Sequence, residues 1–237
     1  MIEPATFGFI LTRMGIRRLL LGLLPTRTNR HRRAALRFAR TTLSPEQRVL
    51  LEETPGCLSA EQGAVLYTLA AYPPTTGTVV EIGSFLGRST CWLAAGVRHA
   101  GRGRVVSIDP HAGHERPPVH LQEQDTSAAL ARHVRQAGLS EWVEFVRRPS
   151  GQAAEKWHEP IDLLWIDGSH TYEDVLSDLN NFARYVVEEG HIALHDTRGG
   201  RFPGVRRAMR QFFTAHPQFR RILNLRNMAV YRRQSPP

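Results

Sequence analysis

Short apolar runs alternate with amphipathic stretches along the chain from about residue 75 onward. The first run, Val79–Ile82, indicates a buried strand that stops at Gly83 and is followed by a helical pattern. Alternation of strand and helix is typical of a parallel sheet with helices on both faces. The later elements predicted in this way are strands at residues 105–108, 142–146, 161–166 and 191–194, helices at 90–100, 127–137, from about 172 and at 205–213, and two closing strands at 220–225 and 228–232.

Two helix starts before the first strand carry the same capping pattern. Ser44 and Ser59 are each followed three residues later by a glutamine. This pairing satisfies N–H groups that would otherwise lack partners at a helix start. Further upstream, residues 7–24 predict an amphipathic helix and residues 29–41 predict a second, very basic helix.

Positive charge is concentrated in this N-terminal region, which we expect to form an arm over residues 1–55, before one main domain over residues 56–237. The chain carries a formal charge of +9, but residues 1–45 hold nine arginines and a single glutamate. The main domain is therefore nearly neutral, which argues against a nucleic-acid partner. Arginines make a membrane span costly within residues 7–24. The arm then either contacts an anionic membrane surface from the cytoplasmic side or packs as a cap or dimerisation element.

The turn after the first strand holds Glu81, Gly83 and Gly87 in the order Glu-x-Gly-x-x-x-Gly. Glycines let a backbone approach a ligand closely, and the start of the next helix offers free N–H groups. The dinucleotide fingerprint has three glycines, so this pattern disfavours an NAD-dependent oxidoreductase. A carboxylate at the strand end instead suits a cationic ligand. Asp109 ends the second strand, where related folds hold a nucleoside ribose.

Other histidines and the cysteines point to no second site. His111, His114 and His120 lie in a proline-rich stretch, which predicts a loop or lid at the ligand edge more than a metal cluster. The two cysteines, Cys57 and Cys91, fit no metal spacing. We expect Cys91 to be a core thiol, and nothing in the cysteine pattern departs from a cytoplasmic protein.

Ionisable residues follow the fourth and fifth predicted strands. Asp167 and His170 come after the fourth strand, and His195 and Asp196 come after the fifth. The carboxyl ends of parallel strands meet at one edge, where open α/β sheets bind ligands. Two carboxylates and an imidazole suit a divalent ion that keeps open positions for a substrate. The alternative for each residue is a helix cap or a structural hydrogen bond, such as Asp167 capping the helix that begins near Tyr172.

Over residues 76–213 the chain resembles the class I methyltransferases, in particular the metal-dependent natural-product and sugar O-methyltransferase group. Four stretches carry the resemblance: Glu81–Thr90, Asp109–His111, Ile166–Leu179 and His195–Asp196. It implies a Rossmann-like α/β fold with a mostly parallel seven-stranded sheet, helices on both faces and an antiparallel last strand. It also implies S-adenosylmethionine as the cofactor, together with Mg²⁺ or another divalent cation.

The same resemblance implies an in-line reaction in which a substrate hydroxyl attacks the sulfonium methyl group. His170 is then the base that takes the hydroxyl proton. The predicted metal ligands are Asp167, His195 and Asp196, and the predicted cofactor-binding residues are Glu81, Gly83, Ser84, Gly87, Ser89, Asp109, Ser150 and Asp167. The expected partner is a small hydroxyl-bearing sugar, polyketide or phenolic compound. The alternative is a non-catalytic binding or scaffold protein that keeps this fold.

Overall fold

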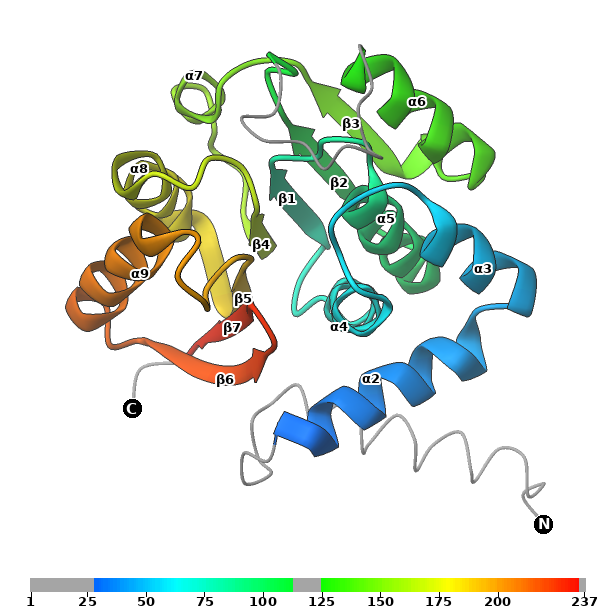
Figure 1. Ribbon diagram of the computed structural model, residues 1–237, viewed down its shortest axis with the longest axis horizontal. Coiled ribbons are helices and arrows are strands. Elements are labelled where there is room, and N and C mark those ends of the chain that lie inside the picture. Colours follow the sequence, from blue (N-terminus) through cyan, green and yellow to red (C-terminus); the bar gives the residue numbers. More distant parts are fainter. Residues whose placement is uncertain (1–27, 113–124, 235–237) are drawn as a thin grey trace.

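The computed structural model describes residues 28–112 and 125–234, and its centre is a seven-stranded sheet (Figure 1). The strand order is β3-β2-β1-β4-β5-β7-β6. The first five strands pair in parallel, whereas β7 runs antiparallel to both β5 and β6. The predicted fold class is therefore confirmed. In chain order the strands are β1 (Thr78–Ile82), β2 (Arg104–Ile108), β3 (Val143–Val146), β4 (Ile161–Ile166), β5 (Val186–Leu194), β6 (Phe219–Leu225) and β7 (Met228–Arg233).

Helices cover both faces of this sheet (Figure 1). On one face, α4, α5 and α6 bury their apolar sides with α2 in one core cluster, and α7, α8 and α9 form a second cluster on the other face. No helix of the described residues is long and apolar enough to cross a membrane. The helices are α2 (Thr28–Thr42), α3 (Pro45–Glu53), α4 (Ala60–Ala71), α5 (Arg88–Ala100), α6 (Thr126–Gln136), α7 (Ser150–Ala154), α8 (Tyr172–Phe182) and α9 (Pro203–Ala215), with short 3-10 turns at Ser140–Trp142 and Ala183–Tyr185.

Both predicted capping boxes are present. Ser44 starts α3 and Ser59 starts α4, and in each case the serine side chain accepts from the backbone of the glutamine three residues on. The side chain of that glutamine accepts in return from the serine N–H. These reciprocal bonds fix where each helix begins. Gln62 also forms a hydrogen bond outside its own helix, from Nε2 to Asn227 Oδ1.

The described part of the arm packs on the main domain. Helix α2 buries the Phe38 ring against Tyr67, Tyr72 and His99, whose ring centroids lie 5.2–5.4 Å from that of Phe38. The Tyr67 and His99 rings also contact each other, with centroids 5.9 Å apart. Cys91, the expected core thiol, is fully buried in the same cluster. These contacts favour packing over membrane contact for α2. The division into an arm and a main domain stays a prediction, since residues 1–27, including the predicted helix at 7–24, lie outside the described residues.

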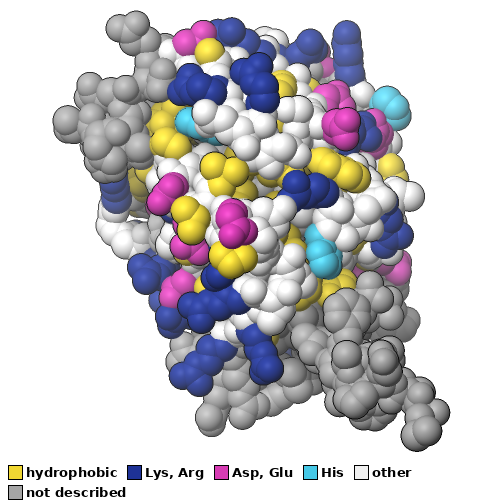
Figure 2. Space-filling model, turned by 90° about the vertical axis from the view of Figure 1, so that its right-hand side faces the viewer, with side chains coloured by type: hydrophobic (Ala, Val, Ile, Leu, Met, Phe, Trp, Pro, Cys, Tyr) yellow, Lys and Arg dark blue, Asp and Glu magenta, His cyan; other side chains and the backbone are white. Residues whose placement is uncertain are grey.

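Charge on the surface is mixed. Figure 2 shows one face of the molecule, on which arginine side chains lie in several separate groups with acidic side chains between them. Helix α2 joins this mixed pattern, because its Arg32 forms an ion pair with Glu61 of α4. On this face we find no single basic patch of the kind that would favour a nucleic-acid partner.

One strand is longer than its sequence pattern predicts. Strand β5 begins at Val186 rather than at His191, and its register against β4 shifts between Ile161 and Leu163. Glu189 has a φ of 65°, a left-handed conformation within the strand. An irregularity of this kind interrupts the alternation of apolar positions, which is why the sequence pattern shows only the second half of β5.

Candidate active site

The carboxyl ends of the central strands are aligned by backbone hydrogen bonds just beyond the regular ladders. This alignment brings the residues that follow β1, β4 and β5 to one edge of the sheet, as the sequence predicts. The bonds are Gly83 N–H to Ile108 O at 2.9 Å, Asp167 N–H to Ile82 O at 2.8 Å, and His195 N–H to Ile166 O at 3.1 Å.

Two glycines shape the turn between β1 and α5. Gly83 has a φ of 86°, and a Cβ there would lie 2.5 Å from Gly168 Cα, so this glycine is needed for the close approach of the β4 end. Gly87 has a φ of 93° and caps α5, where a Cβ would lie 2.6 Å from a methyl carbon of Leu130. Both positions therefore require glycine for the fold itself.

Glu81 lies under this turn with its side chain fully buried. Its two carboxylate oxygens accept from the Ser89 hydroxyl at 2.5 Å and the Thr90 hydroxyl at 2.6 Å, both in the first turn of α5. Burial raises the pKa of Glu81 to about 7, against the opposing effect of the hydrogen bonds from Ser89, Thr90 and Ser107. The predicted cofactor residues Glu81 and Ser89 thus bind each other in this structure.

Asp109 stands at the end of β2 and holds the glycine turn. One oxygen accepts from the N–H groups of Ser84 and Phe85 at 2.9 and 3.0 Å, and the other accepts from His111 N–H at 2.7 Å. Two bonds thus occupy the first oxygen, whereas the second, Oδ1, has a further lone pair that can accept from a ribose hydroxyl. Asp109 and Ser84, both predicted cofactor residues, therefore lie together at the mouth of the turn.

Ser150, the last predicted cofactor residue, begins the short helix α7. Its hydroxyl donates to an oxygen of Asp178 on α8 at 2.5 Å. Burial raises the pKa of Asp178 to about 7, although the Ser150 hydrogen bond acts in the opposite direction. This contact gives Ser150 a structural role in joining α7 to α8.

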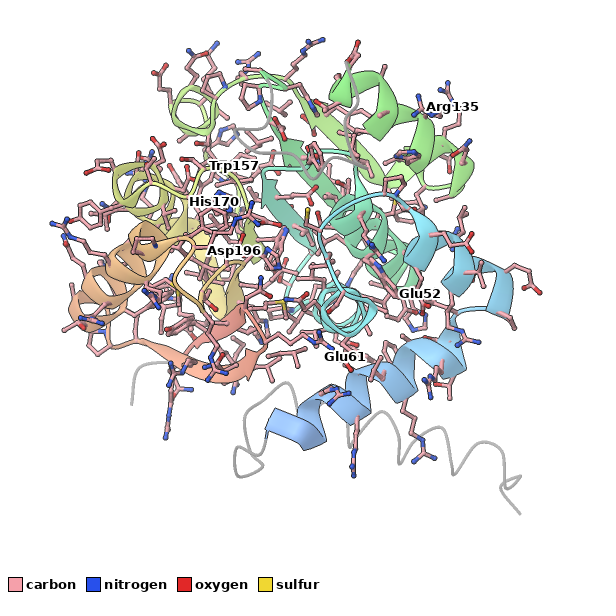
Figure 3. The ribbon with its side chains drawn as sticks, in the orientation of Figure 1. Glu52, Glu61, Arg135, Trp157, His170 and Asp196 are labelled. Atoms are coloured by element: carbon pink, nitrogen blue, oxygen red, sulfur yellow. The ribbon has the colours of Figure 1, made fainter. Side chains whose placement is uncertain are left out.

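Asp167, His170 and Asp196 bring one possible ligand atom each to within 4.8 Å of one another. The ring of His170 lies beside Asp196 at the ends of β4 and β5 (Figure 3), and His170 Nε2 is 2.9 Å from Asp196 Oδ2. Asp196 has a φ of 51°, in the left-handed region. Burial opposes its ionisation, but hydrogen bonds from His170 and His195 lower the pKa of Asp196 well below its usual range.

His195 is the most buried of the four predicted residues at this edge. Its Nδ1 lies 3.1 Å from Asp167 Oδ1 and 3.6 Å from Asp196 Oδ2. Burial disfavours the imidazolium, yet these two carboxylates outweigh it and raise the pKa of His195 to about 10. The two carboxylates thus favour the charged form of His195, and its Nε2 has no hydrogen-bond partner among the described residues.

Comparison with known families shows to which class of protein the residues at this edge of the sheet belong. Residues 80–197 match the model of a family described as a methyltransferase domain. The chain is a methyltransferase. The matched span begins within β1, contains the glycine turn and runs to the residue after Asp196, so it contains every predicted site residue.

Solved structures share the fold of this methyltransferase. The cofactor-bound protein Rv0187 from MTB has a TM-score of 0.59 at 20% identity, over 90% of this chain and 100% of that one. The O-methyltransferase TomG from Streptomyces achromogenes, involved in tomaymycin synthesis and solved with SAM, has a TM-score of 0.58 at 16% identity, over 89% and 100%. CalS11, a TDP-rhamnose 3'-O-methyltransferase of calicheamicin biosynthesis, has a TM-score of 0.52 at 18% identity, over 98% and 96%.

Four neighbours of the methyltransferase site were not predicted as site residues. The Phe202 ring stacks on His170 with centroids 3.9 Å apart, and the Arg201 guanidinium carbon lies over the Phe202 ring, 5.1 Å from its centroid. Cys57 is close enough to the edge that the carboxylates of Asp167 and Asp196 add to burial in raising the pKa of its thiol. Asn227 donates to Asp196. Phe202 could have been found from the sequence because it lies in the loop that follows β5. Cys57 and Asn227 are far from the site residues in the sequence, so no local pattern indicated them.

Proposed function

We propose that this methyltransferase transfers a methyl group from S-adenosylmethionine to a hydroxyl oxygen of a small molecule such as a sugar or natural product. The observation that carries the proposal is the Asp167, His170 and Asp196 group, placed at the sheet edge beside the glycine turn. A hydroxyl is a poor nucleophile and needs a base or a charged partner to lose its proton.

The glycine turn fits the cofactor. Bound S-adenosylmethionine would supply the electrophilic methyl group. At the end of β2, beside this turn, Asp109 Oδ1 keeps a lone pair that would accept from a ribose hydroxyl. Glu81 is buried beneath the turn and would act on the cofactor through Ser89 and the start of α5.

The edge also fits a divalent ion. Asp167 and Asp196 would hold it through carboxylate oxygens, which are the ligands that Mg²⁺ and Mn²⁺ prefer. Such an ion would add positive charge beside the substrate hydroxyl and lower its pKa. His195 lies outside this group of ligand atoms and instead contacts both carboxylates through Nδ1, which keeps them oriented.

His170 is the proposed base. With the Asp196 carboxylate ionised, His170 Nε2 donates to it and Nδ1 is the basic nitrogen. Stacking on Phe202 fixes the plane of the ring. The alternative role for His170 is that of a third ligand, and a ligand role for Nδ1 would exclude its action as the base.

Calorimetry on the purified protein tests the proposal. We expect S-adenosylhomocysteine to bind, Asp109→Ala to weaken that binding by roughly 1.5–3 kcal/mol, and Mn²⁺ binding to be lost in Asp196→Ala. Mn²⁺ binding kept in His170→Ala supports the base role, and its loss supports a ligand role.

The acceptor is tested separately by transfer of a labelled methyl group to a panel of glycosides, phenols and amines. TomG and CalS11 support hydroxyl acceptors in the panel. Label found only on nitrogen, or cofactor binding unchanged in Asp109→Ala, would contradict the proposal.

A further inference from the structure

A chain of amide side chains leads from the start of α4 to the Asp196 carboxylate. Gln62 Nε2 donates to Asn227 Oδ1 at 2.8 Å, and Asn227 Nδ2 donates to Asp196 Oδ1 at 2.8 Å. The backbone carbonyl oxygen of Asn227 also accepts from Thr197 N–H at 2.9 Å. The turn between β6 and β7 therefore forms hydrogen bonds with both Asp196 and the residue after it, Thr197.

The direction of each bond in this chain follows from the capping box of α4. Gln62 Oε1 accepts from the Ser59 N–H at 3.0 Å and from the Ser59 hydroxyl at 2.8 Å, so Nε2 is the end that faces Asn227. Asn227 must then present Oδ1 to Gln62, which leaves only Nδ2 to donate to Asp196. The capping box of α4 thus determines that the nitrogen of the Asn227 amide, and not its oxygen, faces the Asp196 carboxylate.

Asp196 needs this support because of its backbone. Its φ of 51° is uncommon for a residue with a Cβ, and such conformations persist where surrounding contacts hold them. Asn227 holds one carboxylate oxygen, which leaves the other, Oδ2, directed at His170. Without the Asn227 contact, only the His170 bond and the 3.6 Å contact to His195 would hold the carboxylate, both through Oδ2, so its orientation would be less restricted.

We propose that Asn227 and Gln62 are positioning residues that hold the Asp196 carboxylate in its working orientation, an inference that rests on the proposed role of Asp196. Gln62 is almost fully buried, at 2% exposure, so its amide has few other partners to choose from. Both residues lie outside the span 80–197 that matches the methyltransferase family. The support for Asp196 therefore comes from parts of the chain outside the span that the family model matches.

A second contact joins the same two segments. Arg226, next to Asn227, pairs with Glu61, next to Gln62, at 3.2 Å, and Glu61 also pairs with Arg32 of α2. Glu61 lies between α4 and α2 (Figure 3). The Arg226 side chain is largely exposed, so its pair with Glu61 is expected to contribute little. Arg226→Ala is thus a matched control that alters the same turn and spares the amide chain.

The test compares Asn227→Ala, Gln62→Glu and Arg226→Ala in the full chain. Gln62→Glu keeps the oxygen that caps α4 but replaces the donor facing Asn227 with an acceptor, which would reverse the Asn227 amide. Two measurements apply: the ¹⁵N signals of the His170 ring by NMR, and the affinity for Mn²⁺ by calorimetry. We expect both amide variants to shift the His170 signals and to weaken Mn²⁺ binding by about 10- to 100-fold, with Arg226→Ala unchanged.

Combining Gln62→Glu with Asn227→Ala should give little further loss, because both act through one contact to Asp196. Folded amide variants with wild-type His170 signals and Mn²⁺ affinity would overturn the inference, as would losses that add in full. Should Asn227→Ala fail to fold, Gln62→Glu alone decides. If the wild-type protein binds no Mn²⁺, the metal part of the proposed function fails, and the His170 signals still decide the role of the amides.

Discussion

Replacing Glu81 by glutamine should make stability less dependent on pH. The carboxyl group is fully buried, and burial raises its pKa from 4.5 to about 7. A raised pKa means that the folded state favours the protonated form. The contribution of Glu81 to stability is therefore fully present below pH 4.5 and is lost as pH rises through 7. The shift corresponds to roughly 3 kcal/mol in the free energy of unfolding.

Glutamine removes this ionisation and keeps the shape of the side chain. Its oxygen can accept from one of the two hydroxyls of Ser89 and Thr90, and its N–H group can donate to the other. We expect Glu81→Gln to be no more stable than the wild type at pH 5 and more stable by up to about 3 kcal/mol at pH 8.5. Asp178, whose pKa burial raises to about 7, offers a parallel case in Asp178→Asn.

The assay is urea unfolding of both proteins, followed by circular dichroism from pH 5 to 8.5. The difference between the two free energies isolates Glu81, because the other titrating groups are common to both proteins. A ¹³C NMR titration of the Glu81 carboxyl carbon gives the pKa independently. A difference that stays constant over this range, or a carboxyl midpoint near 4.5, would refute the reasoning.

Three further predictions concern the site and the arm. His170→Ala should lower turnover by roughly 10²–10⁴-fold across pH 6–9 with cofactor binding kept, and near wild-type turnover would exclude the base role. Gly83→Ala should destabilise the fold by roughly 1–3 kcal/mol, since its Cβ would meet the β4 end; unchanged urea unfolding would contradict this. Phe38→Ala should cost roughly 3–5 kcal/mol because the ring is buried against Tyr67. A stable Phe38→Ala protein that still sediments with anionic vesicles would favour the membrane role of the arm instead.

The sheet edge was predictable because it depends on local patterns. Apolar runs ending at Gly83, Asp109, Asp167 and Asp196 identified the strand ends, and parallel strands place such ends together. Gly83 marked the turn correctly, but the reason is packing against the β4 backbone rather than the approach of a ligand. The two serine caps are local as well, which is why Ser59 marked the start of α4 correctly.

Contacts made by polar side chains across the fold were not predictable. Gln62 was visible only as a capping residue, because its second partner, Asn227, lies 165 residues away. Glu81 was expected to face a ligand, yet the start of α5 folds over it and leaves it buried. Ser150 was assigned to the cofactor, whereas its hydroxyl is engaged by Asp178. In each case the partner is set by the element that packs against the residue in the fold. A local sequence pattern does not contain that information.

The place of β7 in the sheet has a consequence for how the protein is made. This strand is the last of the chain, yet it lies between β5 and β6. During synthesis, β5 must wait with one open edge, and open edges pair readily with other chains. Late docking of the hairpin closes that edge and, in the same step, brings Asn227 against Asp196. The contacts that cover the β5 edge and the contact that holds Asp196 thus come from the same hairpin.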